Sequence, residues 1–181
     1  MDTIIANLIQ KGEDLLNKPF VPIKFTKEEI IDDKLNDIIN YPHHFVLACI
    51  MDRQIKAERA WGITYIICEK IYDHSFKGLQ KLSQKEILNF FQENNLHRFN
   101  KIMANCFYNG IQRIHNYYQD NASLIWKENL HSATIVRRFL QFDGIGIKIA
   151  TMATNILARD FKIPMKDKIC IDISPDVQVK K

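Results

Sequence analysis

The stretch from residue 43 to residue 51, His-His-Phe-Val-Leu-Ala-Cys-Ile-Met, constrains the fold more than any other part of the sequence. Wound into a helix, it would be hydrophobic on nearly every side. A helix of that kind is stable only when other elements surround it. Pro42 opens this helix, and the polar residues 52–57 end it. We therefore expect a central helix around which the rest of the chain packs.

Apolar residues repeat at helical spacing in several further segments, and no segment shows sustained alternation with a period of two. The prediction is an all-α protein whose 181 residues form one domain or two lobes that share a core. The expected helices span 3–17, 26–40, 58–72, 83–94, 98–118 and a last pair at about 134–156, with a short piece at 76–82.

Local signals set several helix starts and buried stripes. Thr26 and Ser132 are expected to act as N-caps, and Ser83 with Glu86 forms a capping box. The 26–40 helix should bury its isoleucines and leucine, and the 98–118 helix should bury a second stripe. These stripes comprise Ile30, Ile31, Leu35, Ile38 and Ile39, and then Ile102, Met103, Cys106, Ile111, Ile114 and Tyr118.

Composition favours an ordinary globular protein with a mildly basic surface. The net charge is +4 and the pI is about 8.8, which is compatible with a nucleic-acid partner but does not require one. The four cysteines form no Cys-x-x-Cys pair, so we expect reduced thiols, no iron–sulfur cluster and no other cofactor. A monovalent cation at the turn described next is left open. Without a signal peptide or a membrane span, the expected location is the cytoplasm.

A Gly-Ile-Gly turn joins the last pair of predicted helices. The sequence from Phe139 to Thr154 runs from an apolar helix through Gly144-Ile145-Gly146 into a second helix that carries Lys148 in its first turn. This pattern is typical of a helix-hairpin-helix motif. Glycines give the backbone freedom that a Cβ would obstruct, and they let main-chain amides approach an anion at a helix start. A DNA phosphate is the anion we expect there, although many helical hairpins contain glycine only because the backbone must turn.

Three motifs occur in a fixed order. The central apolar helix ends in an Arg53-Gln54 turn, the hairpin follows with its lysine, and Pro-Asp-Val-Gln-Val comes last at 175–179. In this order they resemble the helix-hairpin-helix/Gly-Pro-Asp (HhH-GPD) superfamily of DNA glycosylases, which includes endonuclease III and the 8-oxoguanine DNA glycosylases. The resemblance covers about residues 42–181. It implies that residues 1–40 belong to a second lobe, 41–158 to the helical bundle, and 159–181 to a connection with the catalytic aspartate.

The resemblance also implies roles for individual residues. Lys148 matches the lysine that attacks the sugar in lyase-type members, and Asp176 matches the aspartate found in nearly all members. Asp172 is a competing candidate for that carboxylate. Gly144, Ile145 and Gly146 would grip the DNA backbone, while Gln54, beside Arg53, would fill the gap left by an extruded base. The expected function is base-excision repair by a bifunctional glycosylase and AP lyase.

Other interpretations of these residues remain open. Lys148 could be a solvated surface lysine, Asp176 an N-cap, and Gln54 an ordinary loop amide. His43 and His44 are adjacent, so their side chains do not face one another on a helix, and we predict no metal site from them. Arg137 and Arg138 could reach phosphate or form a solvated face.

The chain also departs from the family's pattern. Residues 159–168 form an apparent polar insertion, and the sequence stops five residues after Asp176. We therefore expect the second lobe to be incomplete. The alternative functions are a non-catalytic helix-hairpin-helix module that binds the DNA backbone, or a purely structural turn. The expected partner is duplex DNA with a damaged base whose identity the sequence does not specify, bound by a nucleoid-associated monomer with no membrane contact.

Overall fold

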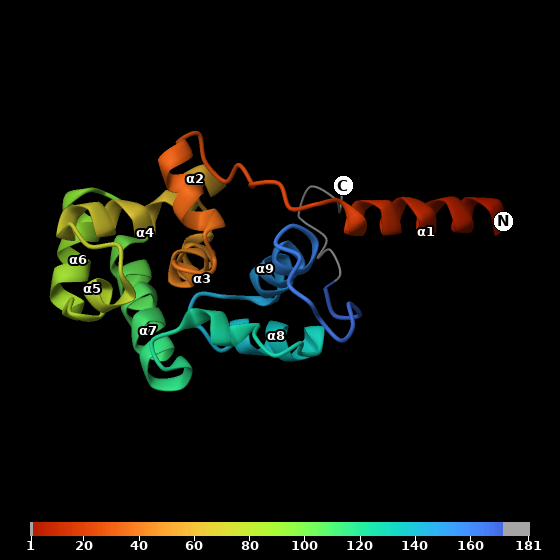
Figure 1. Ribbon diagram of the computed structural model, residues 1–181. Helices are drawn as coiled ribbons and strands as arrows, with labels where there is room; N and C mark the ends of the chain where they lie inside the picture. Colours follow the sequence, from red (N-terminus) through yellow and green to blue (C-terminus); the bar gives the residue numbers. More distant parts are fainter. Residues whose placement is uncertain (1, 172–181) are drawn as a thin grey trace.

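The computed structural model describes residues 2–171, and within that range all regular elements are helical (Figure 1). The predicted all-α class is confirmed. No helix in this range is long and apolar enough to cross a membrane. In chain order the elements are α1 (Asp2–Asn17), α2 (Glu29–Asn36), α3 (Pro42–Met51), α4 (Ala57–Ile71), α5 (Phe76–Gln80), α6 (Gln84–Glu93), α7 (Asn100–Tyr118), the 3₁₀ turn η1 (Ala122–Ile125), α8 (Ser132–Phe139) and α9 (Ile147–Arg159).

Helix α3 is the predicted central helix. All ten of its residues are buried, and it packs against α2, α4, α7, α9 and η1. The approach of α7 is especially close, because a Cβ added to Gly110 would lie 2.6 Å from the Cδ1 atom of Ile50. Phe45 contacts Trp61 of α4 and Trp126 after η1 through ring contacts. The apolar run therefore organises the core as its composition predicts.

The predicted helix starts have mixed outcomes. The Ser83–Glu86 capping box is present at the start of α6. The caps predicted at Thr26 and Ser132 are wrong, because each hydroxyl donates instead to a carboxylate. Thr26 Oγ1 bonds to Asp32, and α2 begins only at Glu29. Ser132 is already helical, after His131 as N-cap, and its hydroxyl donates to Asp167.

The buried stripes are also correct only in part. Ile31, Leu35 and Ile38 are buried, but Ile30 and Ile39 are 57% and 85% exposed. The physical reason at Ile39 is that α2 ends at Asn36, so the helical spacing no longer sets the direction of later side chains. On α7 the predicted stripe is buried except for Ile102, which is 57% exposed.

The N-terminal helices differ in how they meet the body. Helix α2 shares the core, since its buried residues lie in the same hydrophobic cluster as those of α3 and α4. Helix α1 extends away from the body (Figure 1), and its apolar side chains at Ile4, Ile5, Leu8 and Ile9 are more than half exposed. A division of the chain at residue 40 stays a prediction.

The polar connection after α9 is anchored to the start of α8. The Asp167 carboxylate accepts hydrogen bonds from the Ser132 hydroxyl and faces His131 Nδ1 at 2.5 Å. These bonds, that of Ser132 first, lower the pKa of Asp167 to about 2. Further along, the Asn155 side chain donates to the carbonyl of Ile171. The connection therefore runs back along the hairpin helices rather than away from them.

Candidate functional site

The hairpin turn requires a glycine at its first position. Helix α8 ends at Phe139, a turn follows, and the amide of Ile145 bonds back to the carbonyl of Phe142 at 3.1 Å. Gly144 has a φ of +93°, a backbone conformation that residues with a side chain rarely adopt. A Cβ there would also touch Ile50 and Cys106, each with an atom at 3.4 Å. The predicted need for backbone freedom is confirmed at Gly144.

Gly146 has a different environment. Its φ of −93° and ψ of 177° suit any residue, and nothing lies within 4 Å of the Cβ position. The prediction that this position needs the backbone freedom of glycine is therefore wrong at Gly146. Gly146 is the N-cap of α9 and has no side chain to accept hydrogens from the first-turn amides. The fold itself leaves an open, bare stretch of backbone at this helix start.

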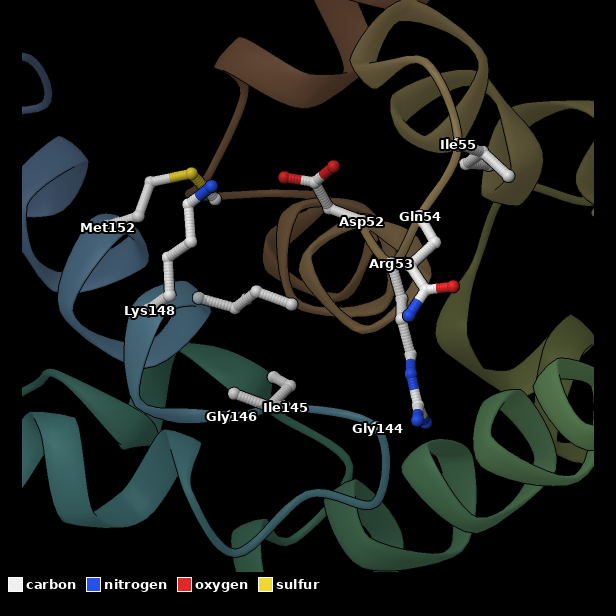
Figure 2. A pocket seen from close by; sticks show the side chains of 10 residues that line it. Asp52, Arg53, Gln54, Ile55, Gly144, Ile145, Gly146, Lys148 and Met152 are labelled. Carbon is white, nitrogen blue, oxygen red and sulfur yellow. The ribbon is translucent and has the colours of Figure 1, made fainter. Parts of the chain in front are cut away.

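One pocket collects the residues that the sequence singled out (Figure 2). A cavity of about 730 Å³ lies between the α3–α4 loop and the hairpin with the first turns of α9. Six predicted site residues line it, and they come from two segments that lie far apart in the sequence. These are Arg53, Gln54, Gly144, Ile145, Gly146 and Lys148, joined by Asp52, Ile55, Ile149 and Met152. The two candidate carboxylates, Asp172 and Asp176, lie outside the described residues.

The α3–α4 loop contains a residue with positive φ, and a buried histidine anchors its first end. Gln54 has a φ of +56°, which is uncommon for a residue with a side chain, and its side chain is exposed. The carbonyl of Met51 accepts bonds from the Arg53 amide at 2.7 Å and from His97 Nε2 at 3.2 Å. The His97 Nδ1 atom accepts from the Phe99 amide. These bonds anchor the end of α3, after which Arg53 and Gln54 line the pocket.

Asp52 is a pocket residue that the sequence interpretation missed. Burial raises the pKa of its carboxyl, while the nearby charge of Lys148 acts in the opposite direction. Figure 2 shows the two side chains entering the same part of the pocket, Asp52 from the end of α3 and Lys148 from α9. The available signal was its position directly after the central apolar helix. Perturbed carboxyls of this kind often lie at functional sites.

The two arginines at the end of α8 are not equivalent. Arg138 Nη1 donates to the carbonyls of Leu124 at 2.7 Å and Ile125 at 3.1 Å, so this guanidinium ties α8 to η1. Arg137 is exposed on the same helix. Of the two residues proposed to reach phosphate, Arg137 therefore presents its side chain to solvent and Arg138 has a structural partner.

The residues that could hold a metal ion lie elsewhere. In the part of the chain that the structure describes, His44, Cys68 and His74 form the group whose ligand atoms lie close together, and none of them lines the pocket.

Comparison with protein-family models, curated proteins and solved structures finds no match to this chain. The interpretation of the pocket therefore rests on its own residues.

Proposed function

We propose that this chain is a DNA glycosylase of the HhH-GPD superfamily, which excises a damaged base and then nicks the strand as an AP lyase. The observation that supports this most strongly is the convergence of Gln54, Lys148 and the Gly-Ile-Gly turn around one open pocket. Gln54 comes from the α3–α4 loop, whereas Lys148 belongs to the same segment as the turn, and the three features were selected for different steps of the same reaction. Their meeting in space is what base excision requires.

The hairpin would hold the DNA backbone. Gly146 leaves open space at the start of α9, so a phosphate oxygen can approach the first-turn amides closely. Helix starts attract anions through their N–H groups and their partial positive charge. Gly144 sets the path of the turn that places these amides beside the pocket.

The α3–α4 loop would fill the gap that an extruded base leaves. Rotating a nucleotide out of the stack costs a few kcal/mol and leaves an unpaired partner base. Gln54 presents an exposed amide at the tip of an anchored loop, and an amide can donate to and accept from a base edge. The cavity lies within the ~300–1,000 Å³ range of small-molecule sites, which suits a flipped nucleotide.

Lys148 would perform the covalent step. Its neutral amine attacks C1′ of the sugar, the N-glycosidic bond breaks, and the base leaves with the bonding electrons and takes up a proton. The C1′–O4′ bond then opens, O4′ takes up the amine proton, and a Schiff base forms between Lys148 and C1′. Loss of a C2′ proton from this Schiff base permits β-elimination, which breaks the bond between C3′ and the phosphate oxygen. Asp52 lies beside Lys148, and its carboxylate would stabilise the positive charge that develops on the sugar. The resemblance assigns the same electrostatic role to Asp176.

Borohydride trapping on duplexes that each carry one damaged base tests this proposal. Reduction of the Schiff base should yield a covalent protein–DNA adduct with the unaltered chain and with the control Lys101→Gln, an exposed lysine of α7. The adduct should be lost in Lys148→Gln. An adduct that persists undiminished in Lys148→Gln would show that another group is the nucleophile. Salt-sensitive duplex binding without any adduct or strand cleavage would support the non-catalytic DNA-binding module instead.

A further inference from the structure

A second cluster of reactive side chains lies at the other end of α3. His44 stands in the first turn of α3, Cys68 in the last turn of α4, and His74 in the loop between α4 and α5. One ligand atom from each residue lies within 4.8 Å of the others. His44 and Cys68 are buried to 1% and 0% exposure, and the His74 side chain is 20% exposed. The cluster is therefore a nearly closed site with one edge near solvent.

The separation of the ligand atoms suits a tetrahedral ion. His44 Nε2 lies 3.7 Å from Cys68 Sγ. Zinc–sulfur bonds of ~2.3 Å and zinc–nitrogen bonds of ~2.0–2.1 Å, at a tetrahedral angle, place sulfur and nitrogen roughly 3.6 Å apart. The same distance is long for a strong hydrogen bond, and a thiol is a weak donor. The spacing therefore fits two ligands of one metal ion as well as it fits a weak thiol–imidazole hydrogen bond.

The Nδ1 atom of His74 is buried and has no hydrogen-bond partner among the described residues. The Nδ1 atom of His44 also has none, but His44 approaches Cys68 through Nε2, so an ion accounts for the His74 nitrogen alone. Buried polar atoms without partners are rare and cost free energy. The other nitrogen of His74, Nε2, lies 2.8 Å from the Glu69 carboxylate, so Nδ1 is the atom that His74 has left for an ion.

Neighbouring groups hold His74 in place. Glu69 fixes its ring through Nε2, in the carboxylate–histidine arrangement that orients many metal ligands. His43 Nε2 donates to the backbone carbonyl of His74 at 3.0 Å. The side chain of Asp73 accepts from the Ser75 amide at 2.8 Å, which tightens the same loop. The ligand from the loop is thus as well supported as the two from the helices.

We propose that His44, Cys68 and His74 bind a zinc ion. Thiolate and imidazole are the ligands that zinc prefers in proteins, and a carboxylate-oriented histidine is a usual member of such sites. Solvent would provide the fourth ligand at the partly exposed edge beside His74. Binding displaces the thiol proton of Cys68. The ion would tie the start of α3 to the end of α4 and to the following loop, independently of any DNA chemistry at the pocket.

Metal titration of the chelator-treated full chain tests the proposal. Zinc should bind at one ion per chain and raise the Tm. Substituted cobalt(II) should give the intense visible bands of a tetrahedral site and a near-ultraviolet thiolate charge-transfer band. Cys68→Ser should lose the charge-transfer band and weaken zinc binding by more than ~100-fold, while Glu69→Gln should weaken it by about 10- to 100-fold. The control Cys170→Ser, which removes an exposed thiol, should bind as the unaltered chain does.

His74→Gln provides a second test in case Cys68→Ser does not fold. The His74 side chain is partly exposed, so its replacement should leave the fold intact. This variant should keep its helical circular dichroism and lose the zinc-induced rise in Tm. The proposal is overturned if the unaltered chain binds no zinc, or if Cys68→Ser and His74→Gln bind it as tightly as the unaltered chain. Loss of binding in Cys170→Ser alone would also overturn it.

Discussion

The two ends of α3 meet opposite surroundings. At its start His43 and His44 are 3% and 1% exposed and lie against α4, the loop after it and α5. At its end the chain enters the exposed loop of Arg53 and Gln54, which forms one wall of the open pocket. Buried polar groups need partners within the protein, whereas exposed ones can be left for a ligand. Side chains at the start of α3 are therefore enclosed by the protein, whereas those beyond its end are accessible to a ligand.

The sharpest contrast in stability should come from truncating one residue in each environment. Phe45→Ala removes a fully buried ring within α3 and should lower the free energy of unfolding by about 3–5 kcal/mol. Arg53→Ala, on the exposed loop, should change it by no more than about 0.5 kcal/mol. Urea unfolding followed by circular dichroism measures both values. Similar losses in the two variants would mean that the pocket loop is part of the core.

The two hairpin glycines allow the same contrast within three residues. Gly144→Ala places a side chain at positive φ and should cost about 1–2 kcal/mol of stability. Gly146→Ala should leave stability within about 0.5 kcal/mol, since its Cβ meets no protein atom. If a phosphate approaches Gly146, this variant should still lose duplex affinity, as measured by fluorescence anisotropy. If Gly146→Ala binds duplex DNA as tightly as the unaltered chain, the hairpin does not contact the DNA backbone at this position.

Acid should weaken the anchor of the pocket loop through His97. Burial is the main cause that lowers the pKa of this imidazole, so the unfolded chain takes up a proton at a higher pH than the folded chain does. The contribution of His97 to stability is fully present above the unfolded pKa of about 6.5 and is lost as pH falls through the folded value. The free energy of unfolding, measured at a series of pH values, should therefore fall less steeply towards acid pH in His97→Gln than in the unaltered chain. If the two free energies fall in parallel, protonation of His97 does not cause the loss.

The smallest expected effect is at Asp52, where stability and activity should change in opposite directions. Its raised pKa means that the charged carboxylate costs stability once pH rises through the folded value. Asp52→Asn should gain a few tenths of a kcal/mol at neutral pH, a gain that disappears near pH 3. The yield of the borohydride adduct should fall in the same variant. If Asp52→Asn changes neither the free energy of unfolding nor the adduct yield, Asp52 has no role in the pocket.

Features set by neighbouring residues were predictable from the sequence. The burial of α3 follows from its composition, and the capping box of α6 follows from residues three positions apart. The hairpin and Lys148 were found because the Gly-Ile-Gly turn is itself local. The failures at Thr26 and Ser132 have one cause, since a carboxylate that the cap rules do not consider, Asp32 or Asp167, takes the hydroxyl.

Features that depend on packing between helices were not predictable. The interpretation of His43 and His44 considered only whether the two adjacent side chains face each other. The His44 ring contacts that of His43, and it also meets Cys68 and His74, which α4 and the loop after it bring to the start of α3. Asp52 was missed for a similar reason, because the burial that raises the pKa of its carboxyl, and the charge of Lys148 that opposes this shift, both depend on the fold. Spacing along one helix carries no information about such pairs.

The complete burial of α3 has a consequence for how the pocket would meet DNA. A helix with no solvent-facing side has neighbours on every flank, so it has little freedom to rotate or slide when a ligand arrives. The loop at its end, held by His97, is therefore preorganised before any encounter. Ordering a flexible loop would otherwise subtract from affinity, and here that entropy is already lost during folding.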